Sequence, residues 1–326
     1  MININEAYFL GLMYSKGDIL ELDDNKISFK INIKFRRPND ESIRSDNIYQ
    51  PVIAHEGGKE KLTSRFINDF LQIKSMLSSE FGINFNILVD ATNNIDWDKK
   101  VMSITSDPIS NTDTKFTALF CVSKIKPSVL KTFPYSLKLE DSKPVSLSFI
   151  QGVCDGCSLV PNEATGQNGG TGDPRIQLEP NQDRWELCIG LCMLFQKGLG
   201  IRVNNINWGH PEIRNIWRGQ NHQFRVSFSD IPDDIELYRL EYKREEYHNL
   251  YSRMGVSYSP NTDMCPLKKK GIHKGMCIYL HSSTEAALND NLLHNNLKGI
   301  SVDIEGKKSI IVCYLFKIKK ACKGTK

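Results

Sequence analysis

A short apolar helix with a glycine at its centre occurs twice in the sequence. The first copy covers residues 9–19 (FLGLMYSKGDI) and the second covers residues 149–159 (FIQGVCDGCSL). Gly11 and Gly152 stand where a side chain would keep a neighbouring helix at a distance. Two such helices predict two similar halves that pack through these glycines. The alternative is two unrelated amphipathic helices, and the segments that follow each helix favour the repeat.

The length and composition set limits on the class of protein. The chain has 326 residues, which suits two domains, or two similar halves plus an extension. The net charge is only +4, so partners have to be inferred from where the charges lie. We expect no membrane span and no signal peptide, because no long apolar run and no basic leader are visible. The cysteine count is odd, and Cys154, Cys188 and Cys192 fall in apolar helical patterns, which predicts reduced thiols and a cytoplasmic protein.

The clearest local pattern is the strand predicted at residues 26–36. Its odd positions are all apolar and its even positions are all basic or polar, so one face should lie in the core and the other in solvent. The polar positions, with the arginine that follows, are Lys26, Ser28, Lys30, Asn32, Lys34, Arg36 and Arg37. Lysine and arginine contact phosphates or guanine edges and asparagine can read adenine, so this face is a candidate nucleic-acid surface. The alternative is that the lysines protect a sheet edge from aggregation.

The order of predicted elements repeats along the chain. In residues 1–140, helices are predicted at 5–16, 59–81 and 127–137, and strands at 17–22, 26–36, 84–90, 101–106 and 115–125. In residues 141–254, helices are predicted at 144–156, 183–197 and 233–253, and strands at 175–179, 201–208 and 223–229. Polar positions of the later strands hold Arg175, Gln177, Gln223, Arg225 and Ser227. The sequence therefore predicts an α+β fold of two pseudo-symmetric αββαββα halves.

Residues 255–326 are predicted to form a C-terminal extension of unknown role. They contain the basic run 268–270, an amphipathic stretch at 284–297 and a hairpin that ends in 310–320. Cys265, His273 and Cys277 are irregularly spaced, and we interpret them as scattered thiols instead of a zinc site.

The doubled pattern resembles the LAGLIDADG homing endonucleases in their single-chain, two-repeat form. The resemblance lies in YFLGLMYSKGDI, in its copy FIQGVCDGCSL, and in RIQLEP and DRWELCIGLCMLFQKGLGI, and it covers residues 5–254. It implies a monomer with an internal pseudo-twofold axis, in which the two helices form the interface between halves. Each half's antiparallel sheet would form a saddle on the major groove of double-stranded DNA. An acidic residue at the foot of each helix would hold the divalent metals that cut the strands.

This sequence departs from that pattern at both metal positions. Aligned on Gly11, the acidic position falls on Lys16; aligned on Gly152, it falls on Cys157, and the next residue is Ser158 instead of glycine. Lysine and a protonated thiol are poor ligands for Mg²⁺, which prefers hard oxygen ligands. The resemblance therefore implies sequence-specific DNA binding without cleavage, with no catalytic residue and no cofactor. Such a protein would be a regulator, or the recognition subunit of a separate nuclease or motor, as in a restriction system.

Two alternatives remain open from the sequence. One is an active Mg²⁺-dependent homing or restriction endonuclease that uses Asp18 and Asp155, each two residues from the expected position. Two residues along a helix turn a side chain by about 200°. The other is a protein-interaction scaffold, in which the acidic segment 233–246 covers the basic strand face.

Overall fold

The computed structural model describes more than half of the chain, including both glycine-bearing helices and the strands that follow them. The described residues are 2–23, 25–34, 58–88, 101–134, 136–137, 143–159, 175–178, 180–181, 184, 187, 190–191, 194–201, 203–208, 223–227, 231–232, 234–254, 277–282, 300–304 and 307–313. None of the helices in this part of the chain has the length and apolarity needed to cross a bilayer.

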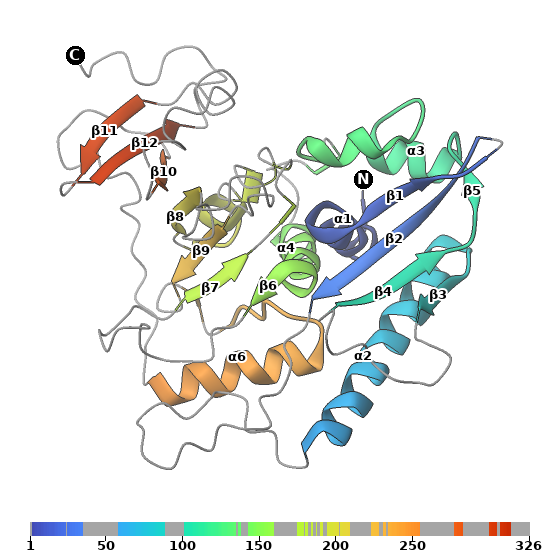
Figure 1. Ribbon diagram of the computed structural model, residues 1–326, viewed down its shortest axis with the longest axis horizontal. Helices are drawn as coiled ribbons and strands as arrows, with labels where there is room; N and C mark the ends of the chain where they lie inside the picture. Colours follow the sequence, from blue (N-terminus) through green and yellow to red (C-terminus); the bar gives the residue numbers. More distant parts are fainter. Residues whose placement is uncertain are drawn as a thin grey trace.

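Two helices lie side by side at the centre of the fold (Figure 1). These are α1 (Ile4–Lys16), which begins with an Asn3–Glu6 capping box, and α4 (Lys143–Cys157). A Cβ atom on Gly11 would lie 2.1 Å from the carbonyl oxygen of Phe149, and one on Gly152 would lie 2.2 Å from that of Tyr8. The absence of side chains at these two positions lets the helix backbones touch. Every residue of α1 from Ala7 to Ser15 is buried.

The first sheet follows α1 and is antiparallel throughout. It contains β1 (Asp18–Glu21), β2 (Lys26–Lys34), β4 (Val101–Ser106) and β3 (Phe85–Leu88) in that order, and β5 (Ile109–Ser110) also pairs with β2. The odd residues of β2 from Ile27 to Ile33 are fully buried, as their alternation predicts. They share a core with α1 and with phenylalanines of α2 (Gly58–Phe81) and α3 (Thr114–Phe120). The centroid of the Phe9 ring lies 4.7–6.4 Å from those of five other phenylalanines, Phe29, Phe81, Phe85, Phe116 and Phe120.

The second sheet follows α4 and begins with the same strand order. Across the sheet the order is β6 (Ser158–Leu159), β7 (Arg175–Leu178), β9 (Gln223–Ser227) and β8 (Val203–Trp208), and each neighbouring pair is antiparallel. The π-helical turn η2 (Leu194–Gly198) precedes β8, and α6 (Glu241–Met254) follows β9. The fold is therefore α+β, with antiparallel sheets in both parts.

The C-terminal residues extend this second sheet. The strand β10 (Cys277–Ser282) pairs in parallel with β8, and β12 (Lys307–Cys313) and β11 (Ile300–Ile304) continue beyond it. The hairpin predicted near the C-terminus is confirmed as β11 and β12, although its continuation beyond residue 313 lies outside the described residues. The basic run 268–270, the stretch 284–297, Cys265 and His273 lie outside them as well.

Three predicted elements were wrong in type or extent. The strand predicted at 115–125 is replaced by the short helix α3, because the Asp113 side chain accepts hydrogen bonds from the amides of Lys115 and Phe116 and caps a helix there. The helix predicted at 127–137 is only a 3₁₀ turn, η1 (Pro127–Lys131). The helix predicted at 233–253 begins at Glu241, because the amides of residues 239 and 240 donate to a carboxylate of another helix.

Candidate nucleic-acid interface

The lysine-bearing strand β2 lies inside the first sheet, not at its edge. It pairs with β1 on one side and with β4 on the other. Edge protection therefore does not explain its lysines. Among the described residues, the acidic segment 233–246 packs elsewhere: α6 begins at Glu241 and docks on α2, where Asp69 accepts hydrogen bonds from its first two amides at 3.2 Å. Lys26 is exposed and Lys30 is partly exposed.

Neighbouring strands add small polar side chains to the same face, which we call the outer face of the first sheet. Strand register places Lys30 between Asp18 of β1 and Thr105 of β4, and it places Asn32 opposite Ser103. Asn86 of β3 lies opposite Thr105 and is exposed. This outer face therefore combines lysine ammonium groups and amide side chains with the Asp18 carboxylate. Ammonium and amide groups hydrogen-bond to phosphates and base edges.

Two predicted contact residues on this face have structural roles instead. Ser28 is only 4% exposed, and its hydroxyl donates to the carbonyl oxygen of Ser106. The Asn32 amide donates to the carbonyl oxygen of Lys16 at 3.0 Å and to the Asp18 carboxylate at 2.9 Å, while its oxygen accepts from Ser103 at 2.7 Å. These engaged groups argue against the predicted DNA contacts of Ser28 and Asn32.

Replacing Asn32 with alanine is expected to lower the free energy of unfolding by about 1–3 kcal/mol, because three partly buried polar groups lose their partner. Asn86→Ala is the matched control, since its exposed amide on the same sheet hydrogen-bonds only Asp107 among the described residues. Asn86→Ala should lower the free energy of unfolding by less than about 1 kcal/mol, measured by urea denaturation. Equal losses for the two variants would contradict the structural role of Asn32.

The predicted polar positions of the second sheet also meet in register. Arg175 pairs with Ser227, and Gln177 pairs with Arg225, across β7 and β9. Gln223 and Arg225 pair in turn with Asn207 and Asn205 of β8. The intervening residues Ile176 and Leu178 are buried. Sequence reasoning missed the two asparagines because the pairing of β8 with β9 shifts between Val203 and Asn205, and this irregularity disguises the alternation.

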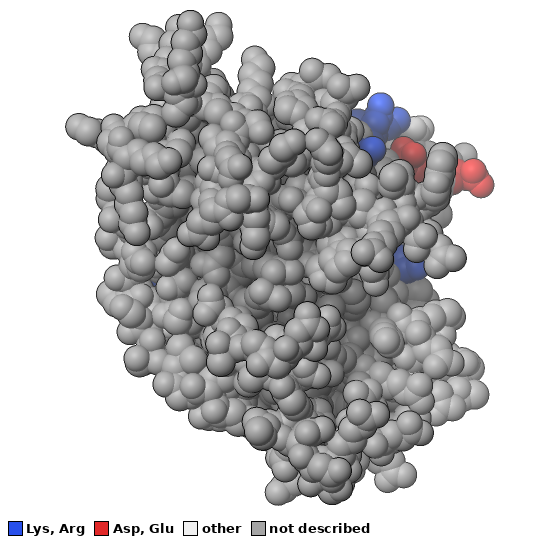
Figure 2. Space-filling model, turned by 60° about the vertical axis from the view of Figure 1, so that its left-hand side comes forward, with Lys and Arg blue, Asp and Glu red and all other residues white. Residues whose placement is uncertain are grey.

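Three predicted residues of the basic surface are not described in full. Arg36 and Arg37 lie outside the described residues. Lys34 ends β2, opposite Val101. Among the described residues, Figure 2 shows basic and acidic side chains close to one another at one edge of the face turned toward the viewer.

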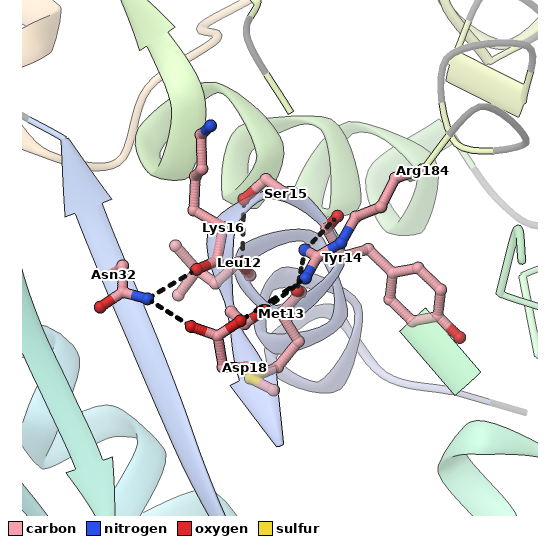
Figure 3. Close-up of polar contacts among 9 residues, drawn as sticks. Leu12, Met13, Tyr14, Ser15, Lys16, Asp18, Asn32 and Arg184 are labelled. Atoms are coloured by element: carbon pink, nitrogen blue, oxygen red, sulfur yellow. Dashed lines mark hydrogen bonds and ion pairs between the residues drawn. The ribbon is translucent and has the colours of Figure 1, made fainter. Parts of the chain in front are cut away.

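The C-terminal end of α1 is held by Arg184, a buried residue that sequence reasoning also missed. Its guanidinium donates to the carbonyl oxygens of Met13 at 2.9 Å, Tyr14 at 2.8 Å and Gly17 at 2.6 Å (Figure 3). The Asp18 carboxylate lies 4.0 Å from it. A cation here offsets the negative end of the helix dipole and satisfies its terminal carbonyl groups. No local pattern marks Arg184, because its partners are more than 160 residues away in the chain.

The C-terminal end of α4 is held in a similar way by Lys243. Its ammonium group is buried and donates to the carbonyl oxygens of Cys154, Asp155 and Ser158. The Asp155 side chain is fully buried and accepts from the Tyr8 hydroxyl at 2.8 Å and from the amides of residues 239 and 240. Burial raises the pKa of Asp155 to about 7. Asp155 therefore ties α1, α4 and the start of α6 together.

These residues do not fit the divalent metals that the resemblance implies. The expected ligand positions hold Lys16 and the fully buried Cys157. Asp155 cannot turn toward a metal without leaving Tyr8 and two backbone amides unpaired. Asp18 is partly exposed, but one of its oxygens accepts from Asn32 and the other lies near Arg184. These contacts argue against the alternative assignment of Asp18 and Asp155 as a pair of Mg²⁺ ligands.

Comparison with known proteins finds similarity only among solved structures. No model of a known protein family matches the sequence, and no curated protein does. The N-terminal LAGLIDADG domain of DUF199/WhiA aligns over 76% of this chain and 84% of its own, with 9% identity and a TM-score of 0.32. The I-LtrWI LAGLIDADG homing endonuclease bound to target DNA aligns over 82% and 88%, with 10% identity and a TM-score of 0.33. The LAGLIDADG meganuclease I-AabMI bound to uncleaved DNA aligns over 78% and 94%, with 11% identity and a TM-score of 0.32. Similarity of this degree does not assign the chain to a family, so its function has to be inferred from its own residues.

Proposed function

We propose that this protein binds double-stranded DNA sequence-specifically through the outer faces of its two sheets and does not cut it. The observation that carries the proposal is the lysine-bearing face of β2. On this internal strand, Lys26 lies opposite Ser110 of β5, and Lys30 lies between Asp18 of β1 and Thr105 of β4. The major groove of DNA is wide enough for a two-stranded β-ribbon, and lysines on such strands contact phosphates or guanine edges.

The second sheet would read the other part of the target. It follows α4 as the first sheet follows α1, its first four strands have the same order, and its polar positions hold Arg175, Gln177, Gln223 and Arg225. We propose that residues 1–140 and 141–254 are pseudo-symmetric halves of a monomer that together form a saddle on the duplex. Because the halves differ in sequence, the target should be asymmetric.

The absence of cleavage is proposed from the groups at the feet of the two helices. Lys16 and Cys157 replace the acidic ligands, and Asp155 is engaged by three hydrogen-bond donors. A protein that recognises a site and leaves it intact would serve as a regulator, or as the recognition subunit of a separate nuclease or motor. Residues 255–326, which extend the second sheet through β10, would enlarge its surface.

The central test is selection of bound sequences from a random duplex library, followed by titration of the selected duplex at several salt concentrations. We expect a defined asymmetric site and an affinity that falls steeply with salt. In a plot of the logarithm of the binding constant against that of the salt concentration, each phosphate contact should contribute about 0.9 to the slope. Lys30→Ala should reduce this slope by about 0.9, or relax the preference at one position. Lys126→Ala is the control, because this exposed lysine precedes η1 and belongs to neither sheet. Equal binding to heparin and to the selected duplex would contradict the proposal.

Cleavage is tested separately with a plasmid that carries the selected site. We expect the plasmid to remain intact with Mg²⁺ or Mn²⁺ at protein concentrations that saturate the site. Discrete cleavage products that disappear in Asp18→Asn would show a nuclease and overturn the non-cleaving assignment.

A further inference from the structure

We propose that Lys16 binds a backbone phosphate at the point where the two half-sites of the bound duplex meet. The inference rests on the proposed function and adds a contact that neither sheet face supplies. It starts from the direction in which the two central helices pack.

The helices α1 and α4 run parallel. Ser148, near the start of α4, donates a hydrogen bond to the carbonyl oxygen of Ile4, the first residue of α1. Gly11 and Gly152 meet in the middle. Near the C-terminal ends, a Cβ on Gly156 would lie 2.1 Å from the Ser15 hydroxyl oxygen. Both helices therefore end on the same side of the molecule.

Each helix leads directly into the first strand of its own sheet. After α1 comes Gly17 and then β1 at Asp18, and after α4 comes β6 at Ser158. The parallel pair thus brings the beginnings of both sheets to one place. A duplex that contacts the outer faces of both sheets has to pass over this end of the helix pair.

Lys16 is the last residue of α1 and lies at this junction. Its carbonyl oxygen accepts a hydrogen bond from Asn32, which shares the outer face of the first sheet with Lys30. The carbonyl groups of the preceding turn receive their hydrogen bonds from the buried Arg184. In Figure 3, the Lys16 side chain extends away from both Asp18 and Arg184. Lys16 therefore stands at the end of the helix pair that an anion crossing the junction would meet, while Asn32 and Arg184 act as positioning residues.

The charge balance of the junction supports an anionic partner. The C-terminal end of a helix carries a partial negative charge, and two such ends side by side would repel a phosphate. Here a buried cation caps each end, Arg184 on α1 and Lys243 on α4. With both ends neutralised in this way, the helix ends no longer oppose a phosphate beside Lys16.

The test combines a protein variant with a local change in the DNA. Lys16→Ala should weaken binding about five- to tenfold for every sequence and reduce the salt slope by about 0.9, whereas Lys16→Arg should restore both. Lys143→Ala is the matched control, because it removes the same charge from the opposite end of the pair, roughly 20 Å away along the 15-residue α4. It should leave both quantities unchanged.

The position of the contact is tested with methylphosphonates, which remove the charge of single phosphates. At the centre of the selected site, a methylphosphonate should lower the affinity of the unmodified protein for the duplex and leave that of Lys16→Ala unaltered. At other positions it should lower the affinity of both proteins equally. An unchanged salt slope for Lys16→Ala, or equal penalties at the centre for both proteins, would overturn the assignment of Lys16 and leave the proposed function standing. If the unmodified protein shows no preference for any duplex, the proposed function fails together with this inference.

Discussion

Gly11→Ala is expected to lower the free energy of unfolding by about 3–5 kcal/mol, a large part of the stability of a domain of ordinary size. The added methyl group would lie 2.1 Å from the Phe149 carbonyl oxygen and 2.9 Å from the Gly152 Cα and the Val153 nitrogen. All three are backbone atoms of α4, so no side chain can rotate to relieve the overlap. The helices would have to separate, and the fully buried residues around them would lose contacts.

The sign of this effect distinguishes helix packing from helix propensity. Alanine favours an isolated helix over glycine by about 1 kcal/mol, so Gly11→Ala would stabilise a helix that nothing approached closely. Gly152→Ala should cost as much as Gly11→Ala, because its Cβ would meet backbone atoms of Tyr8 and Leu12. Gly156→Ala should cost less, because its nearest neighbour is the Ser15 hydroxyl, which belongs to a side chain that can rotate.

The control and the measurement use the same kind of substitution. A Cβ on Gly198 would have no neighbour closer than 3.7 Å, so Gly198→Ala should change the stability by less than about 1 kcal/mol. Urea denaturation of the four variants gives the order directly. Unchanged stability of Gly11→Ala would mean that α1 and α4 do not pack through their glycines. The inference that both sheets begin at one end of the helix pair would then be wrong as well.

The sequence predicts the elements that carry a strong period of their own. The alternation of β2 identifies both its buried face and its polar face, and the three- and four-residue spacing of Phe70, Ile73 and Leu77 identifies the buried face of α2. Short segments are harder to predict. In α3, Phe116 and Phe120 fit an alternating strand as well as one turn of a helix, and the structure is decided by the Asp113 cap and by the left-handed Cys121 that ends the helix.

Some residues of the candidate site can likewise be predicted from the sequence, and others cannot. The polar positions of β2, β7 and β9 follow from alternation and can be found without a structure. The roles of Asn32, Asp155, Arg184 and Lys243 cannot, because each depends on groups that only the tertiary fold brings within hydrogen-bond distance. Asn32 has the residue type and position of a base reader, yet its amide joins the end of α1 to β1 and β4.

The buried carboxyl group of Asp155 is expected to make the stability of the protein depend on pH. Burial raises its pKa in the folded protein from 3.8 to about 7, so the folded state keeps a proton that the unfolded state releases near pH 4. Because the folded state binds more protons across this window, the free energy of unfolding falls as the pH rises from about 4 to about 7 and then levels off. A difference of about three pH units corresponds to about 4 kcal/mol.

Asp155→Asn separates this contribution from all others, because asparagine keeps the shape of the side chain and does not ionise. Its oxygen can accept from the amides of residues 239 and 240, and the Tyr8 hydroxyl can turn to accept from its amide. The variant should gain up to about 4 kcal/mol relative to the unmodified protein between pH 4 and pH 8, measured by urea denaturation at several pH values.

Glu80→Gln provides a control of opposite sign. Hydrogen bonds from Asn3 lower the pKa of Glu80, so its contribution is present above the unfolded pKa and is lost as the pH falls through the folded one. Relative to the unmodified protein, Glu80→Gln should therefore become less stable as the pH rises, while Asp155→Asn becomes more stable. A difference between the unmodified protein and Asp155→Asn that stays constant from pH 4 to pH 8 would show that Asp155 ionises normally. Lys243 and the hydrogen-bond donors around the carboxylate would then offset the effect of burial on its pKa.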